Sequence, residues 1–229
     1  MNNLFYIGDT PVDVNNQWDY ENGFYITSHA SRLAKSIAHY EIYKLSLGLP
    51  GDIVECGVYK GASLTRFATF RQILESEYSR KIIAFDIFGQ FPRNENDDEN
   101  DRSFIDEFEH AGGKGISEDE LRRVLEYKNF NNIELVQGDI IKTVPDYYDR
   151  SPQAKISLLH IDVDVYEPTK VILETLYNRV VSGGIIIFDD YSTVNGETRA
   201  IDEFLSNSKV DAKINKLPFY KNPAYLVKP

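Results

Sequence analysis

Residues 51–63 read GDIVECGVYKGAS, and this stretch decides the fold. Its first part, Ile53–Cys56, is largely apolar and rich in β-branched residues, which predicts a strand covered on both faces. Gly57 and Gly61 then permit a tight turn, and a helix is expected to begin near Ser63. A strand that passes through a glycine-containing turn into a helix is typical of an α/β domain.

The same alternation of strand and helix patterns continues along the chain. Short apolar runs predict strands at Ile53–Cys56, Ile82–Asp86, Ile133–Gly138, Ile156–Asp162 and Gly184–Asp189. Helical patterns lie near Leu64–Tyr78, Ser117–Tyr127, Pro168–Val181 and Glu197–Ser206. This order predicts a Rossmann-like, doubly wound and mostly parallel sheet. Two further strands, Ala212–Tyr220 and Ala224–Lys228, predict an antiparallel hairpin at the sheet edge, with Asn222-Pro223 in its turn.

Two segments lie outside this alternation of strands and helices. Residues 1–27 carry many aromatic side chains but no reliable strand or helix pattern, so we expect an irregular arm before a domain at 28–229. The arm packs its aromatics on the domain or on a second subunit, or contacts substrate. At the start of the domain, a helix is expected over Ser28–Leu47, with Ser28 as its N-cap. Its apolar face is expected to hold Leu33, Ile37, Tyr40, Tyr43 and Leu47.

The second segment, about 89–116, is a long connection after the second predicted strand. It holds an acidic run at Asn94–Asp101, a short amphipathic piece at Phe104–Phe108, and a glycine-rich end. Long connections inside a compact domain are usually functional or disordered. Its position places it above the carboxyl ends of the strands, where ligands bind in open α/β folds, so we expect a mobile lid rather than a decorative insertion.

Composition narrows the class of partner. The 229 residues include 25 Lys and Arg against 36 Asp and Glu, a formal charge of −11. That balance argues against nucleic acid and against anionic membranes, which both recruit basic residues. A single cysteine, Cys56, excludes an internal disulfide. The start lacks the pattern of a signal peptide, and no apolar stretch approaches the roughly 20 residues of a membrane span. We therefore expect a cytoplasmic protein.

Acidic and glycine residues at three strand ends suggest the cofactor. Glu55 precedes Gly57 and Gly61, which differs from the G-x-G-x-x-G of dinucleotide sites. A carboxylate there repels a pyrophosphate but suits a sulfonium or ammonium group, as in S-adenosylmethionine (SAM). Asp86 ends the second strand, where an acid accepts hydrogen bonds from ribose hydroxyls. Gly138-Asp139 follows the third, near the expected adenine edge. Together these positions favour a SAM site, although each signal is weak alone.

Four more acids follow the next two strands. His160-Ile161-Asp162-Val163-Asp164 closes the fourth strand, and Phe188-Asp189-Asp190 closes the fifth. Carboxylates brought together repel one another and raise one another's pKa, a conflict that a divalent cation removes. Oxygen ligands without cysteine favour Mg²⁺, or else Mn²⁺ or Ca²⁺. The alternative is that Asp162 and Asp189 cap helices or bind water. His160, in an apolar strand, is expected to be a satisfied core histidine.

The chain resembles the macrocin-type O-methyltransferase family from about Ser28 onward. The resemblance rests on SHASRLAKSIAHYEIYKL, GDIVECGVYKGAS, AFDIFGQFP, LLHIDVDVYEPT and SGGIIIFDDY. It implies a class I methyltransferase fold, a lid, a homo-oligomer, and methylation of a hydroxyl on a sugar-like small molecule. It implies Mg²⁺ on Asp162, Asp189 and Asp190, with a proton-accepting aspartate that is either Asp162 or Asp164. The cofactor-binding residues are then expected to be Glu55, Gly57, Tyr59, Gly61, Ser63, Asp86, Gly138 and Asp139.

Three other functions fit parts of the pattern. A catechol-type, metal-dependent O-methyltransferase also uses acids at these strand ends. A SAM-binding partner protein without catalysis is possible on the fold alone, but the intact acid cluster disfavours it. A nicotinamide oxidoreductase is disfavoured because the G-x-G-x-x-G pattern is missing.

Overall fold

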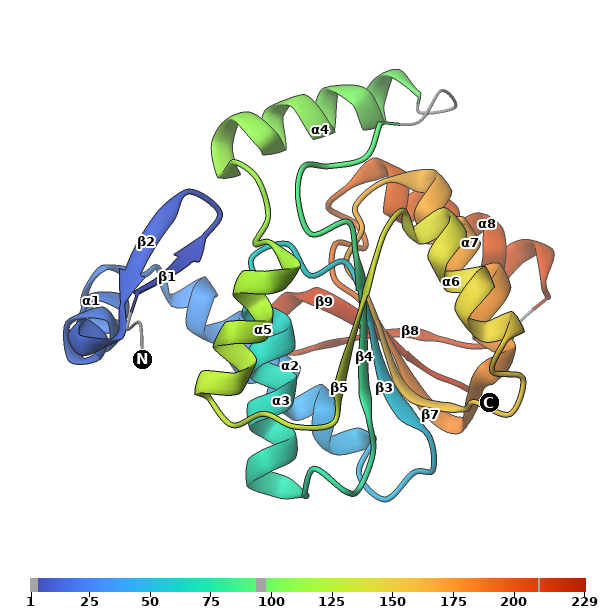
Figure 1. Cartoon of the computed structure of the whole chain (residues 1–229). Coiled ribbons are helices and arrows are strands. Elements are labelled where there is room, and N and C mark those ends of the chain that lie inside the picture. Colours follow the sequence, from blue (N-terminus) through green and yellow to red (C-terminus); the bar gives the residue numbers. More distant parts are fainter. Residues whose placement is uncertain (1–3, 94–97, 210) are drawn as a thin grey trace.

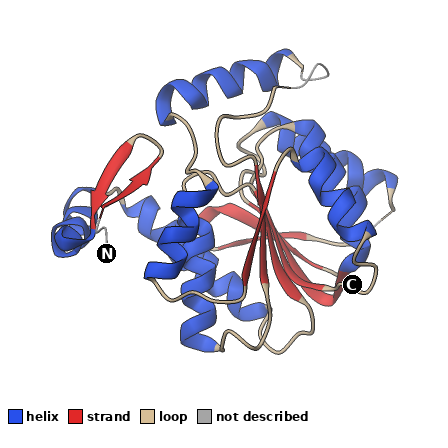
Figure 2. Cartoon of the chain, in the orientation of Figure 1, coloured by secondary structure: helices blue, strands red, loops and turns tan. Residues whose placement is uncertain are grey.

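The computed structural model describes residues 4–93, 98–209 and 211–229. A seven-stranded sheet lies between two layers of helices (Figures 1 and 2). Its strand order is β5-β4-β3-β6-β7-β9-β8. The parallel strands are β3 (Asp52–Cys56), β4 (Ile82–Asp86), β5 (Ile133–Gln137), β6 (Ile156–Ile161) and β7 (Val180–Phe188). Antiparallel to β7 runs β9 (Tyr220–Val227), which pairs with β8 (Ile214–Leu217). The predicted doubly wound sheet with an antiparallel edge is confirmed.

Helices cover both faces of the sheet (Figure 1). One layer holds α2 (Ala30–Leu45), α3 (Ala62–Leu74) and α5 (Glu118–Tyr127), and the other α6 (Ile140–Asp149), α7 (Tyr166–Leu176) and α8 (Asn195–Asn207). Successive strand residues point to opposite faces. Accordingly Ile53 packs in the cluster that contains Phe67 of α3, and Val54 in the cluster that contains Val144 of α6. Both faces are buried, which explains why the strands read as unbroken apolar runs.

Several element boundaries differ from the sequence prediction. The helix expected over Pro168–Val181 ends at Leu176, and a short 3-10 turn, Tyr177–Arg179, follows it. Strand β7 begins at Val180 because that residue already pairs with Ile156, ahead of a register shift. Helix α6 was not predicted, since Pro145 in its middle interrupts the helical pattern.

The turn of the C-terminal hairpin was predicted at the wrong place. Strand β8 ends at Leu217 and β9 begins at Tyr220, so Asn222 and Pro223 lie inside β9. The pairing shifts register between Lys216 and Leu217, which gives room for the proline. The Asn222 side chain donates to the backbone oxygen of Asp189, 3.2 Å away, and so braces the end of β7.

The N-terminal arm is regular rather than irregular. It forms a hairpin of β1 (Leu4–Ile7) and β2 (Thr10–Asp13), a 3-10 turn and α1 (Gln17–Thr27). The hairpin docks on α5: Phe5 is buried near the Tyr127 ring, and Glu120 accepts a hydrogen bond from the Tyr6 backbone. The aromatic side chains of α1 are exposed on this chain. Among the described aromatic residues of the arm, only Phe5 is buried against the domain, as the prediction of packing on the domain requires.

Helix α2 also differs from its prediction. His29, not Ser28, is its N-cap, because the His29 ring accepts from the Ser31 backbone. The buried side chains are Ala38, His39, Ile42 and Tyr43. The predicted apolar face is therefore rotated, with Leu33 and Ile37 about two-fifths exposed, at 40% and 43%.

The segment after β4 crosses above the carboxyl ends of the strands, as predicted (Figure 1). It contains α4 (Glu99–Gly112), which is longer than the expected amphipathic piece. Residues 94–97 of the predicted acidic run lie outside the described residues. Among the described helices, none is long and apolar enough to cross a membrane.

Candidate active site

The carboxyl ends of the parallel strands open into a cleft of about 300 Å³. The predicted site residues that line it are Gly57, Tyr59, Asp86, Gly138, Asp139, Asp162, Asp164, Asp189 and Asp190. The lid segment lines it as well, through Phe91, Phe108 and Glu109. Glu55, Gly61 and Ser63 lie outside this lining. The sequence thus placed the cleft correctly, and most of the predicted residues meet there.

Gly57 controls how closely β3 and β6 approach at the cleft. Its φ is +91°, and a Cβ built there lies 1.7 Å from the backbone oxygen of Asp162. The Asp162 amide donates to the Cys56 oxygen at 2.9 Å, which ties the two strand ends together. Only glycine permits this approach, because any other side chain collides with the neighbouring strand.

Asp86 holds the turn that follows β3. One carboxylate oxygen accepts from the amides of Val58 and Tyr59, at 2.6 and 3.0 Å, and the other from Phe88 at 2.6 Å. Burial raises the pKa of Asp86, and the three amides oppose that rise. A carboxylate has about four lone-pair sites, so one is left for a ribose hydroxyl. The structure therefore shows Asp86 as the residue that organises this turn.

The end of β5 also lines the cleft, beside the Asp86 turn. Gly138 has a φ of +139°, and its backbone amide donates a hydrogen bond to the backbone carbonyl oxygen of Asp86 at 2.9 Å. Asp139 caps α6 by accepting from the Ile141 amide at 3.1 Å. Both residues therefore lie beside the Asp86 turn, where the sequence placed them.

Three acids form a group at the other end of the cleft. Asp162, Asp164 and Asp190 each present a carboxylate oxygen within 4.8 Å of the others. Burial, with the charge of Asp189 added, raises the pKa of Asp162 to about 8. Burial and neighbouring carboxylates also raise the pKa of Asp164 and Asp190. Crowded acids with raised pKa values and only oxygen donors fit a hard divalent cation.

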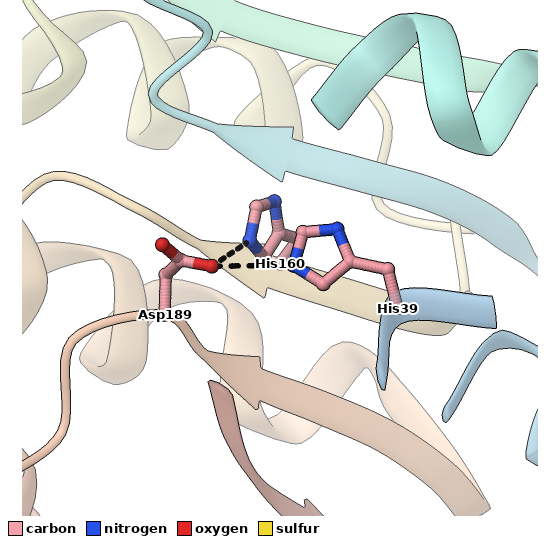
Figure 3. Close-up of side chains that lie close together, drawn as sticks. All are labelled: His39, His160 and Asp189. Carbon is pink, nitrogen blue, oxygen red and sulfur yellow. Dashed lines mark hydrogen bonds and ion pairs between the residues drawn. The ribbon is translucent and has the colours of Figure 1, made fainter. Parts of the chain in front are cut away.

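Asp189 has a different set of partners (Figure 3). Its Oδ1 lies 3.3 Å from Nε2 of both His39 and His160, and its Oδ2 contacts the Lys35 ammonium. On its other side His160 contacts Glu55, with 3.3 Å between Nδ1 and Oε1. Burial opposes ionisation of Asp189, but these partners hold its pKa well below the usual range.

The two histidines carry different charges. Burial alone lowers the pKa of His160, but the carboxylates of Asp189 and Glu55 raise it to about 10. Burial and the neighbouring His160 lower the pKa of His39 to about 4, although its hydrogen bond to Asp189 opposes this shift. His160 is therefore an imidazolium and His39 a neutral ring. As predicted, His160 is a buried, bonded histidine.

Carboxylates and basic groups alternate in this network. His160 lies between Glu55 and Asp189, and Asp189 lies between His160 and Lys35. Two histidines and a carboxylate are also a transition-metal ligand set, and a metal bound there would have to displace the proton of His160. Glu55 is fully buried. Its placement beside His160 argues against the predicted direct contact with SAM.

Sequence reasoning missed Lys35 and His39. They lie four residues apart in α2, so they project from the same side of the helix. A pair of basic residues at that spacing, inside a helix otherwise expected to pack on the sheet, is the signal that would have found them.

Asp164 stands in a strained backbone conformation. Its φ is +63°, which is uncommon for a residue other than glycine and occurs often at functional sites. The backbone amide of Glu197 donates to the backbone carbonyl oxygen of Asp164 at 2.9 Å. The Glu197 carboxylate accepts from the backbone amide of Asp190 at 3.1 Å. The first turn of α8 therefore fixes both acids.

The lid segment is joined to the cofactor turn. The Tyr59 hydroxyl and the Lys60 ammonium both donate to the Gly112 oxygen, at 2.6 and 2.7 Å. The Tyr59 ring also packs on Phe108, with 4.9 Å between centroids. The other end is held by Asp101, which accepts from the Tyr166 amide at 3.0 Å. Both ends of α4 thus contact elements that build the cleft.

Comparison with known proteins identifies the family. The macrocin O-methyltransferase (TylF) family model matches residues 32–220. The chain belongs to this family. The matched range contains every predicted cofactor and metal residue, and the N-terminal arm lies before it.

Curated relatives act in antibiotic pathways. Demethyldecarbamoylnovobiocin O-methyltransferase of Streptomyces niveus is 31% identical over 173 residues, which cover 68% of this chain and 58% of that protein. A tetracenomycin rhamnosyl 4'-O-methyltransferase of Streptomyces olivaceus is 28% identical over 65% of this chain and 56% of that protein. The chain therefore spans little more than half the length of these relatives.

Solved structures agree on the fold. A calicheamicin methyltransferase superimposes with a TM-score of 0.68 at 26% identity, covering 96% of this chain and 87% of that one. The O-methyltransferase NovP gives a TM-score of 0.72 at 22% identity, covering 84% and 78%. The fold is therefore that of class I methyltransferases.

Proposed function

We propose that the chain is a SAM-dependent O-methyltransferase that methylates a hydroxyl of a sugar or sugar-containing small molecule, assisted by a divalent cation. One observation carries the proposal: the glycine turn after β3 and the acids after β6 and β7 line one cleft. Family membership and relatives that methylate sugar-bearing antibiotics support it.

The cofactor side is assigned to the turn held by Asp86. Gly57, Tyr59, Gly138 and Asp139 line this side, and SAM supplies the methyl group from its sulfonium. The methyl carbon forms a bond to the acceptor oxygen while its bond to sulfur breaks, and sulfur keeps the electron pair. The sulfonium charge disappears in this step, so a cleft shielded from water by the lid favours it.

The acidic side is assigned to the acceptor. The family resemblance implies a metal on Asp162, Asp189 and Asp190, whereas the carboxylates that cluster within 4.8 Å are those of Asp162, Asp164 and Asp190. Asp162 and Asp190 belong to both sets and are the proposed metal ligands, with Asp189 or Asp164 as the third. A bound divalent cation would orient the acceptor hydroxyl and lower its pKa. We assign proton acceptance to Asp164, because its carboxylate lies within 4.8 Å of those of Asp162 and Asp190 and therefore beside the proposed metal and the acceptor hydroxyl. Its strained backbone, fixed by Glu197, holds the carboxylate in place.

The activity is tested by supplying SAM and Mg²⁺ with a panel of acceptors. The panel holds nucleotide-linked deoxyhexoses, rhamnosides and a catechol, and product is detected by mass spectrometry. A methylated sugar supports the proposal, and methylation of the catechol alone supports the catechol-type alternative. SAM binding without any methylated product supports a non-catalytic protein.

Variants at the acids separate chemistry from binding. Asp162→Asn and Asp164→Asn are expected to lower turnover by about a hundredfold or more while S-adenosylhomocysteine still binds, because asparagine keeps the size of the side chain and the hydrogen bonds of Asp86 to Val58, Tyr59 and Phe88 are untouched. Asp149→Asn, an exposed acid at the end of α6, is the control. Near-normal turnover in Asp162→Asn contradicts the metal assignment. The predicted homo-oligomer is tested separately, by light scattering.

A further inference from the structure

The acidic end of the cleft contains a cation of its own. Lys35 extends from α2 into the cleft lining, and its ammonium contacts Oδ2 of Asp189. Its side chain is 22% exposed. Asp162 and Asp190 line the same cleft and interact electrostatically with the Lys35 ammonium.

Both oxygens of Asp189 are engaged by the protein. Oδ1 faces the two buried histidines, and Oδ2 faces Lys35. The histidine side is closed, because His39 and His160 are fully buried. A ligand in the cleft therefore reaches Asp189 through Oδ2, the oxygen that Lys35 holds.

We infer that Lys35 is the counter-ion of the metal-free site, and that a divalent cation must displace its ammonium from Asp189 in order to bind there. This inference rests on the metal proposed above. The lysine side chain is long and flexible, and its ammonium is a compact charge that exchanges without the fixed geometry of an arginine. The contact neutralises Asp189 in the metal-free chain and weakens divalent binding by competition.

The test is a titration of the metal-free chain with Mn²⁺, followed by electron paramagnetic resonance, with no SAM or acceptor present. Removing the competing cation in Lys35→Met is expected to tighten Mn²⁺ binding about tenfold or more, because a positive charge beside the ion is lost. Lys35→Gln, which keeps a polar end, is expected to act in the same direction. The control is Lys44→Met, which removes an exposed lysine of the same helix that pairs with Glu41.

A double-mutant cycle shows whether Lys35 acts through Asp189. In Asp189→Asn the other three carboxylates still hold Mn²⁺, more weakly. If Lys35 competes for Asp189, adding Lys35→Met to this variant gives a gain in affinity clearly smaller than in the wild-type chain. An equal gain in both backgrounds overturns the inference, as does unchanged or weaker binding in both Lys35 variants.

The outcomes separate the inference from the function. Wild-type binding of Mn²⁺ with no effect of Lys35 overturns the inference alone. Absence of Mn²⁺ binding in every variant, with S-adenosylhomocysteine still bound, overturns the inference and the metal assignment but leaves SAM use standing. Loss of S-adenosylhomocysteine binding in the wild-type chain overturns the proposed function itself.

Discussion

Gly57→Ala tests whether the close approach of β3 and β6 builds the cofactor site. The added Cβ lies 1.7 Å from the Asp162 oxygen and 2.6 Å from its carbonyl carbon, so the strand ends must separate. A positive φ costs a non-glycine residue about 1–2 kcal/mol, and overpacking typically adds about 1–3 kcal/mol. The expected loss of stability is therefore about 2–5 kcal/mol, or roughly 5–15 °C in melting temperature for a chain of this size.

The assay pairs thermal unfolding with calorimetric titration of S-adenosylhomocysteine. Gly48→Ala is the matched control, because Gly48 has a similar φ of +77° but a Cβ there meets nothing within 4 Å. The control carries the backbone strain without the collision and is expected to keep its affinity. Gly57→Ala is expected to lose about tenfold or more in affinity, since the turn held by Asp86 moves with the strand end. Equal melting temperatures and unchanged affinity in both variants would refute the reasoning.

Three further predictions concern the same cleft. Asp86→Asn replaces an acceptor of three amide hydrogen bonds by a group with one acceptor oxygen, and is expected to weaken S-adenosylhomocysteine binding about tenfold in calorimetry. Tyr59→Phe removes the hydrogen bond to Gly112 and is expected to raise the KM for SAM a few-fold, about 1 kcal/mol, whereas the exposed Tyr78→Phe leaves it unchanged. Burial raises the pKa of Asp162 to about 8, so the folded metal-free chain holds a proton there that the unfolded chain releases. Melting in EDTA should show stability falling as the pH rises, with Asp162 alone contributing at most about 1.4 kcal/mol per pH unit from about pH 5 to 8. Saturating Mg²⁺ or Asp162→Asn should reduce that slope, and an identical slope in all three cases would contradict the prediction.

The sheet could be predicted because its strands are buried on both faces. Unbroken β-branched runs such as Ile82–Asp86 have no other stable placement, and their carboxyl ends meet at one edge. The acids that follow those runs were therefore brought together as predicted. The positions of Gly57 and Asp162 follow from the same argument, since each ends a central strand.

The rest depended on contacts between distant segments. The rotation of α2 is set by burial of His39 against Phe67 and His160, and a helical pattern that counted Leu33 and Ile37 as core could not show it. Glu55 was assigned to the cofactor on its position before the glycine, but strand alternation turns its side chain toward His160. In both cases His160 on β6 is a deciding partner, and it lies 160 − 39 = 121 residues from His39 and 105 residues from Glu55.

The most direct test of the proposed function is calorimetric titration of the purified chain with S-adenosylhomocysteine, with and without Mg²⁺. Binding in the micromolar range under both conditions is predicted, because Asp86 holds its turn through the amides of Val58, Tyr59 and Phe88 and not through the acids proposed to bind the metal. Absence of binding under both conditions would contradict the assignment of this cleft to SAM.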